Sequence, residues 1–369
     1  MSKRGENIYK RKDNRWEGRF IKSHDPGGKA KYGYVYAASY REAREKLMKK
    51  RAEYQAPRSQ TKCLREYSEE WLALQETRLK QSTCSKYRGM LRLHILPVFG
   101  DDPISRITAL AVERFGYQLM SEQGSKLSPK SGKDVLTLLQ AILKYACRQE
   151  GASLPLPQII YPREEKKEIR VLSYEEQTKL VNYCSANMDS LHFGVLLAML
   201  TGMRIGELCA LRWGDISEVE GTVSVSKTMQ RIQIDEGLQS RTKIVVDLPK
   251  SDTSKRLIPL TEHARFLCEK YRVPNPDAYV LTGSVNQFVE PRLMQYHLKQ
   301  FAKECGVKEL HFHALRHTFA TRCIEVGVEM KSLSEILGHS SIKITMDRYV
   351  HSSLAFKREN IQKLSAIGM

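Results

Sequence analysis

The sequence predicts a multidomain α+β protein: a small three-stranded sheet plus helix, then a helical bundle, then a mixed, mainly α-helical domain with a small antiparallel sheet. Strand-like alternation and turn residues mark the first part, helical periodicity marks the second, and both patterns occur in the third. The length of 369 residues is enough for two or three domains that each bury a core. We therefore expect domains at residues 1–56, 61–160 and 169–369.

The first domain has the pattern of three strands and one helix. Along the second strand, Trp16, Gly18 and Phe20 alternate with Arg15, Glu17 and Arg19. Such alternation is typical of a strand with one buried face. Clusters of Asp, Asn, Pro and Gly separate the strands, and Ser39 is suited to begin the helix. The expected strands cover 8–11, 15–22 and 29–36, and the expected helix covers 40–54.

Positive charge is concentrated in this first domain. Residues 1–60 hold 17 Lys and Arg against 7 Asp and Glu, whereas the other 309 residues hold 43 against 35. A small basic end on a milder body is typical of a module that binds a polyanion. The alternative is a solubilising tail, but aromatic residues among the charges, such as Trp16 and Tyr34, argue against it.

The second domain has the periodicity of four helices. Apolar residues recur on one face of each, and we expect these stripes to form a core. Pro97 is expected to end the second helix, and Gly151 the fourth. A proline-rich linker is expected over 154–168. The stripes are Tyr67, Trp71 and Leu74; Tyr87, Leu91 and Ile95; Leu110, Phe115 and Leu119; and Leu136, Leu139, Leu143 and Cys147.

The third domain mixes helical and strand-like segments. No phosphate-cradling glycine-rich loop occurs in it, so we expect no nucleotide cofactor. The expected helices cover 174–186, 191–200 and 204–211 and resume near the C-terminus, and the expected strands cover 222–227, 229–234, 243–248 and 256–260.

Composition excludes several classes of protein. The longest apolar run, residues 193–203, is too short to span a bilayer, and no signal-peptide pattern opens the chain. Eight scattered cysteines without a Cys-x-x-Cys pair argue against a disulfide framework and against a thiolate zinc site. We therefore expect a cytoplasmic protein that has no contact with membranes.

Several polar residues of the third domain stand where packing alone would not require them. Arg204 lies in Thr-Gly-Met-Arg-Ile-Gly-Glu-Leu, after an apolar helix. His313, Arg316 and His317 lie in His-Phe-His-Ala-Leu-Arg-His, and His339 lies in Leu-Gly-His-Ser-Ser. Tyr349 follows ten residues later and is the only tyrosine after residue 296.

This set resembles the tyrosine recombinase family, the integrases of phages and conjugative transposons. The family signature is Arg, Lys, His-x-x-Arg, His or Trp, and Tyr, and the three segments quoted above look like its local motifs. The resemblance is strong over the third domain and extends to the second, which looks like the family's core-site binder. The first domain resembles the arm-site DNA-binding domain of conjugative-transposon integrases.

The resemblance implies a site-specific DNA recombinase of a mobile element, active in integration and excision. It would cut and rejoin DNA through a 3′-phosphotyrosine intermediate at Tyr349, with chemistry like that of type IB topoisomerases. Arg204 and Arg316 would clamp the phosphate oxygens without a metal, because a guanidinium offers paired donors. His313 would act as the base, and His339 would donate to a phosphate oxygen.

A lysine would protonate the leaving 5′ oxygen, and Lys250 is the best match, with Lys255 as the competitor. Glu207 matches an acidic family position that orients an arginine, although an ordinary i, i+3 helix pair is the alternative. For His311 and His317 we expect packed core side chains.

The resemblance also implies partners. Double-stranded DNA with core and arm sites is expected, with a homotetramer on that DNA, a small excisionase, and association with the bacterial nucleoid. Candidate DNA contacts are Arg15, Arg19, Lys86 and Arg88. Residues 351–369 carry an apolar stripe and are expected to pack on a neighbouring protomer, with packing on their own subunit as the alternative.

Two other classes of protein remain as alternatives. His311, His313 and His317 have a spacing that a metal-dependent hydrolase could use, but clustered arginines would repel a metal ion. A DNA-binding regulator with an inactive centre is the second alternative. Within the family, resolution of chromosome dimers is a third possible role, and the basic first domain favours integration instead.

Overall fold

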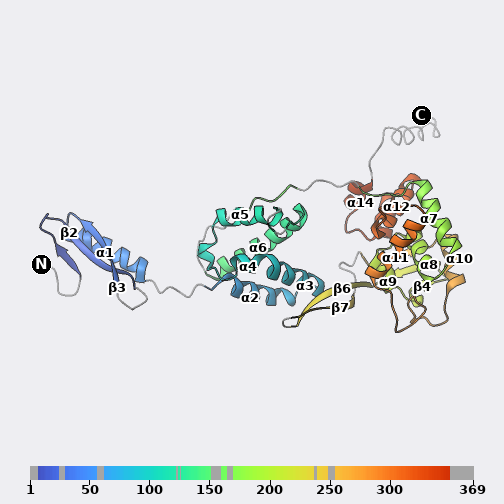
Figure 1. The fold of residues 1–369 in the computed structure, drawn as a ribbon, viewed down its shortest axis with the longest axis horizontal. Helices are drawn as coiled ribbons and strands as arrows, with labels where there is room; N and C mark the ends of the chain where they lie inside the picture. Colours follow the sequence, from blue (N-terminus) through green and yellow to red (C-terminus); the bar gives the residue numbers. More distant parts are fainter. Residues whose placement is uncertain are drawn as a thin grey trace, which may run out of the picture. The chain divides into compact units, whose positions relative to one another are not determined.

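The computed structural model describes residues 7–24, 30–55, 62–121, 124, 126–150, 159–163, 169–236, 239–247 and 254–349 (Figure 1). Its contacts group the chain into two units, residues 1–77 with 90–162, and residues 78–89 with 163–369. A small sheet, a helical region and a mainly helical part with small antiparallel sheets follow one another along the chain. This confirms the predicted fold class.

The N-terminal sheet is antiparallel, with its strands in the order β1 (Ile8–Lys10), β2 (Trp16–His24), β3 (Ala30–Ala37). Helix α1 (Tyr40–Gln55) follows and covers one face. Apolar residues from the sheet and from α1 share one small core, because each element buries only one side. The core residues are Ile8, Phe20, Ala37, Ala43 and Leu47.

Alternation along β2 separates a buried face from a more exposed one, as the sequence predicts. Phe20 is 7% exposed, and its ring occupies the space above Gly33, where an added Cβ would lie 2.5 Å from the Phe20 Cζ. On the opposite face, the guanidinium of Arg19 lies 3.5 Å from the centroid of the Tyr32 ring. Cations stacked on aromatic rings thus line the face that α1 does not cover.

The middle of the chain is helical. Tyr67, Ile95, Phe115 and Leu139 are buried, so each predicted helix contributes to a core. The elements are α2 (Leu64–Glu76), α3 (Gln81–Met90), the π-helical turn η1 (Leu91–Ile95), α4 (Leu96–Phe99), the 3₁₀ turn η2 (Ile104–Arg106), α5 (Ala109–Met120) and α6 (Pro129–Gln149).

Three details predicted for this region are wrong. Pro97 does not end the helix, because it falls in the first turn of α4, where its missing N–H is not needed. Leu110 is exposed, because it stands five residues before Phe115, and Val112 fills the buried position three residues before Phe115 instead. Leu74 is also exposed, because the buried face of α2 runs through Leu64, Ser68 and Leu72 at four-residue spacing.

The C-terminal part packs helices around one core. Helix α8 (Ser190–Thr201) is apolar on all sides and buried almost throughout, as expected of a central helix. The other helices of this part are α7 (Tyr174–Ala186), α9 (Ile205–Ala210), α10 (Glu262–Tyr271), α11 (Pro291–Glu304), α12 (Phe312–Glu325), α13 (Met330–Leu337) and α14 (Ile342–Tyr349), with the 3₁₀ turn η3 (Trp213–Asp215).

Two antiparallel sheets complete this part. Strands β4 (Ile216–Ser217), β5 (Thr222–Val225) and β8 (Arg256–Pro259) form one sheet in that order. Strands β6 (Thr228–Glu236) and β7 (Gln239–Asp247) form a hairpin. In the described parts of the chain, no helix is both long and apolar enough to cross a membrane.

Candidate active site

Arg204 is placed by the turn between α8 and α9. Helix α8 ends at Gly202, whose φ of 64° lies in the left-handed region, and an added Cβ there would lie 2.4 Å from Cδ1 of Phe319. The chain turns at this glycine, and Arg204 becomes the cap residue of α9. Its backbone N–H and its guanidinium both donate to Glu207, at 2.8 and 2.7 Å. These two hydrogen bonds hold both the backbone and the guanidinium of Arg204 against Glu207.

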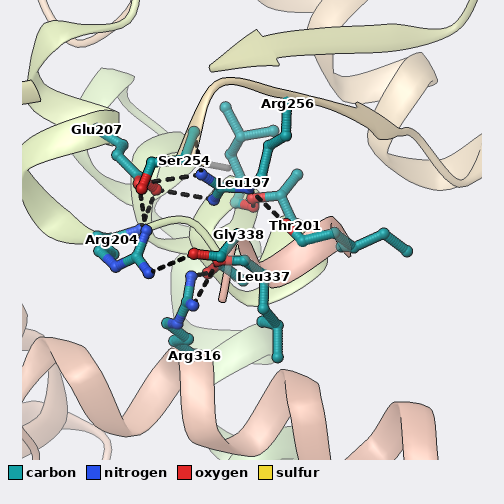
Figure 2. Close-up of polar contacts among 11 residues, drawn as sticks. Leu197, Thr201, Arg204, Glu207, Ser254, Arg256, Arg316, Leu337 and Gly338 are labelled. Carbon is teal, nitrogen blue, oxygen red and sulfur yellow. Dashed lines mark hydrogen bonds and ion pairs between the residues drawn. The ribbon is translucent and has the colours of Figure 1, made fainter. Parts of the chain in front are cut away.

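Glu207 is a buried carboxylate that two arginines share (Figure 2). The guanidinium of Arg256 donates to both of its oxygens, at 3.0 and 2.9 Å. Burial alone would raise the pKa of Glu207, but the hydrogen bonds and charge of Arg256 and the charge of Arg204 lower it to about 2. Glu207 is therefore an anion at neutral pH, even though its side chain is only 3% exposed.

Arg316 is the most deeply buried cation of the site. It projects from α12, is 1% exposed, and donates to the carbonyl oxygens of Gly202 and Leu337. Burial and then the charge of Arg204 lower the pKa of Arg316 to about 9. The positive charge is thus costly where it stands, and a bound anion would offset that cost.

A pocket of about 410 Å³ opens beside these side chains. It brings together four of the predicted catalytic residues, two arginines and two histidines. Guanidinium and imidazole donors on one pocket wall suit a ligand with several acceptor oxygens, such as a phosphate. The lining residues are Arg204, Ser254, His313, Arg316, Gly338, His339, Ser340 and Ile344.

Tyr349 lies at the end of α14, outside the described lining of this pocket. It is 9% exposed and packs into an apolar cluster formed by α12 and α13. Its hydroxyl is 2.8 Å from Nδ1 of His317, and its ring lies nearly parallel to that of His339, with centroids 6.4 Å apart. One histidine therefore borders both the pocket and the tyrosine.

Two predicted parts of the site, Lys250 and the tail 351–369, lie outside the described residues. Ser254, the first described residue after Lys250, does line the pocket, whereas Lys255 is exposed and lies outside the described lining. Glu207 lies behind the pocket, in contact with Arg204.

The four candidate DNA-contact residues all lie outside this unit's pocket. Arg15 is paired with Asp13 at 2.9 Å on the N-terminal sheet, near Arg19 on β2. Lys86 is exposed and Arg88 is half-buried, both on α3. Their contact with DNA stays a prediction.

The sequence does not indicate the site contacts of two residues, His317 and Arg256. His317 was expected in the core, and it is buried, but it also holds the Tyr349 hydroxyl. Arg256 was not singled out, although a signal existed: it precedes Ile258 by two residues on β8, and alternate residues of a strand share a face. Since Ile258 is buried, Arg256 had to be a buried cation in need of partners.

The histidine cluster does not form a metal site in the described residues, where no three His, Cys, Asp or Glu side chains are grouped to hold one ion. Nδ1 of His311 instead accepts a hydrogen bond from the backbone N–H of Ala314 and caps α12. The rings of His313 and His317 meet edge to face, with centroids 4.4 Å apart.

A mainly helical domain with small antiparallel sheets thus holds a pocket that two arginines and two histidines line, beside a tyrosine. The chain belongs to the phage integrase family, whose sequence pattern matches residues 170–355. The SAM-like N-terminal domain of phage integrases matches residues 63–120.

Two relatives have similar sequences. A XerC-like tyrosine recombinase from Caldanaerobacter subterraneus subsp. tengcongensis is 31% identical over 74% of each chain. The ICEBs1 integrase of Bacillus subtilis is 25% identical over 89% of this chain and 90% of its own. The second match therefore covers nearly the whole chain.

Two solved structures have similar folds at 18% identity. The Tn1549 transposon integrase in complex with a circular intermediate DNA has a TM-score of 0.67, over 82% of this chain and 99% of its own. A lambda integrase tetramer bound to a Holliday junction has a TM-score of 0.60, over 91% of this chain and 96% of its own.

Proposed function

We propose that this protein is the integrase of a mobile element and recombines DNA at specific sites through a 3′-phosphotyrosine intermediate at Tyr349. The observation that carries this is the convergence of Arg204 and Arg316 on one pocket, with His339 in contact with both the pocket and the tyrosine ring. A pocket built from cationic donors fits the scissile phosphate of a DNA strand.

In the reaction the two arginines hold the non-bridging oxygens while the phosphorus becomes five-coordinate. Arg204 and Arg316 would supply fixed donors where negative charge grows, and no metal ion is needed for that. His339 donates to a phosphate oxygen from the same pocket. This is the chemistry of type IB topoisomerases.

The covalent step exchanges one phosphodiester bond for another. The Tyr349 hydroxyl leaves its hydrogen bond to His317 and enters the pocket, and its proton passes to His313. The bond from its oxygen to phosphorus forms as the bond to the 5′ oxygen breaks, and Lys250 protonates that leaving oxygen. Because the phosphotyrosine conserves the bond energy, religation needs no ATP and no cofactor.

The DNA partners are assigned domain by domain. Residues 169–369 act at the crossover, residues 61–160 bind the core site, and residues 1–56 bind a distal arm site. The basic, tyrosine-rich face of the N-terminal sheet supports the last assignment, with Arg15 and Arg19 as contacts. Lys86 and Arg88 are the contacts proposed for the core site.

The proposal extends to assembly on DNA. Four protomers would hold two duplexes, in line with the similarity to a lambda integrase tetramer on a Holliday junction. Residues 351–369 would pack on a neighbouring protomer, a small excisionase would bias the reaction toward excision, and the assembly would reside on the bacterial nucleoid.

The test is covalent capture on a nicked suicide substrate. Wild-type protein should form a protein–DNA adduct in EDTA, and Tyr349→Phe should form none while binding the site with nearly equal affinity. An adduct formed by the Phe variant would show that the nucleophile is another residue. Binding without any adduct by the wild type would instead identify a DNA-binding regulator, and dependence on a metal would identify a hydrolase.

A further inference from the structure

Three arginines from three separate elements converge on the C-terminal end of α13 (Figure 2). Each donates to a different carbonyl, and the three carbonyls are consecutive. The contacts join Arg256 to Ile336, Arg316 to Leu337 and Arg204 to Gly338. A helix leaves its last carbonyls without partners and is negative at this end, so it attracts cations.

The end of α13 is built to offer these carbonyls. Gly338 follows the helix with φ of 63°, a left-handed conformation that stops the helix. His339, the next residue, lines the pocket. Whatever fixes this helix end therefore also fixes one wall of the pocket.

All three nitrogens of the Arg256 guanidinium donate to oxygens of the protein. Nε donates to the carbonyl of Ile336, Nη1 to Glu207 and to the carbonyl of Ser254, and Nη2 to the other Glu207 oxygen. Its side chain is 4% exposed and lies outside the described pocket lining. Arg204, in contrast, is 35% exposed and borders the pocket.

This arrangement determines how strongly Glu207 neutralises the charge of Arg204. Arg256 occupies both carboxylate oxygens, and Arg204 shares only one of them through its side chain. Without Arg256, Glu207 would neutralise the charge of Arg204 alone, and Arg204 would then attract any other anion more weakly. Arg256 thus leaves Arg204 positively charged towards the pocket while holding it in place.

We propose that Arg256 is a positioning residue for DNA cleavage. It holds Glu207 and the end of α13 so that Arg204 and Arg316 present their donors to the scissile phosphate. This inference rests on the proposed function, because it requires a phosphate in the pocket.

The first test measures the rate of adduct formation at saturating DNA. Arg256→Gln should slow it at least tenfold, while the affinity for DNA changes less than threefold. Arg272→Gln is the control, because Arg272 likewise bonds a glutamate, Glu218, and also the carbonyl of Ile216, in the same unit but outside the described pocket lining. A rate for Arg256→Gln equal to that of the control would overturn the proposal.

Two modified substrates separate positioning from a structural role. A methylphosphonate at the scissile position removes a negative charge and should shrink the defect of Arg256→Gln at least threefold, because less cationic stabilisation is needed. A 5′-phosphorothiolate, whose sulfur leaves without a proton, should not shrink it. The same defect on ordinary DNA and on both modified substrates would mean a structural role, and rescue by the phosphorothiolate alone would mean that Arg256 acts through Lys250. Either result would overturn the proposal.

A second variant keeps the test decisive if Arg256→Gln does not fold. Arg256→Lys retains the charge but cannot span both Glu207 oxygens and the Ile336 carbonyl. Its rate of adduct formation should therefore be lower than that of wild type and of Arg272→Gln, by less than tenfold. A folded Arg256→Lys that forms adducts at the wild-type rate would overturn the proposal. Adducts formed by Tyr349→Phe would refute the proposed function instead.

Discussion

At the scale of single residues, one buried carboxylate stands among three arginines. Glu207 is bonded to Arg204 and Arg256, and Arg316 reaches the same helix end through a neighbouring carbonyl. One anion cannot neutralise three cations, so the site retains positive charge, and two of the three arginines, Arg256 and Arg316, are nearly inaccessible to water. Such a site gains most from binding an anion, because Coulomb attraction is strong where the effective dielectric is low.

Glu207 should make the stability of the folded protein depend on pH. Its pKa is lowered from 4.5 to about 2, so its carboxylate stabilises the folded state above pH 4.5, and this stabilisation is lost as pH falls toward 2. The difference corresponds to about 3 kcal/mol. Urea unfolding between pH 6 and pH 3 should show a smaller loss of stability for Glu207→Gln than for wild type. Glu269→Gln, which removes an exposed pair with Arg265, should follow wild type; an identical slope for both variants would contradict the prediction.

His317 is a buried histidine that also contacts the proposed nucleophile, Tyr349. His317 is 6% exposed, as a core residue would be, yet its Nδ1 lies 2.8 Å from the tyrosine hydroxyl. Tyr349 is not among the described lining residues of the adjoining pocket. In the proposed reaction its hydroxyl leaves His317 before attack.

At the scale of elements, the turn from α8 to α9 sets the position of the first arginine. Gly202 is needed twice, once for its left-handed φ and once for the close approach of Phe319. Its carbonyl also accepts a hydrogen bond from Arg316. The turn therefore couples the two arginines through the backbone.

Gly202→Ala should impair both folding and cleavage. The new methyl group would lie 2.4 Å from the Phe319 ring, in addition to the strain of the left-handed backbone. Overpacking of this kind costs about 1–3 kcal/mol. Gly327→Ala is the control, because Gly327 also has a positive φ but has nothing within 4 Å of an added Cβ. Equal loss of stability in the two variants, measured by chemical denaturation, would mean that the ring contact is unimportant.

The segment between β7 and β8 carries the proposed general acid. Lys250→Ala should nearly abolish cleavage of ordinary DNA and recover on a 5′-phosphorothiolate substrate, because sulfur leaves without protonation. Adduct formation on the two substrates measures this directly. Lys255→Ala is the matched variant and should lose little on either. Recovery confined to Lys255→Ala would move the role to Lys255.

At the scale of the whole molecule, charge is distributed unevenly. The chain carries 60 Lys and Arg against 42 Asp and Glu, and more than half of the excess lies in the first 60 residues. In the N-terminal sheet several tyrosines on the strand face opposite α1 are exposed, and two of them, Tyr32 and Tyr36, contact arginines. That combination of cations and rings suits contact with a DNA groove.

Deleting residues 1–56 should therefore remove binding to a distal class of DNA site and spare binding to the crossover core. The lost affinity should depend steeply on salt, because each phosphate neutralised by Lys or Arg releases condensed counterion. Gel-shift titrations on the two site classes at several salt concentrations measure both effects. Equal loss on both classes would identify the segment as a nonspecific basic arm.

Much of the fold follows from local pattern. The alternation of Trp16, Gly18 and Phe20 predicts which face of β2 is buried, and the periodicity of Leu136, Leu139 and Leu143 predicts the buried face of α6. The errors arose where spacing departed from helical periodicity, as at Leu110, or where a proline fell in a first helical turn, as at Pro97. Local sequence decides elements because side chains three or four residues apart share a helix face.

The sequence alone determined which residues could carry out the chemistry: an arginine, a His-x-x-Arg segment, a histidine and one late tyrosine, in the order of a known family. Only the tertiary structure decided that Arg204 and Arg256 share Glu207, that Arg316 joins them at the end of α13, and that His317 holds Tyr349. These partners come from segments up to 134 positions apart. Contacts at such separations depend on how helices pack, and neither periodicity nor spacing records that.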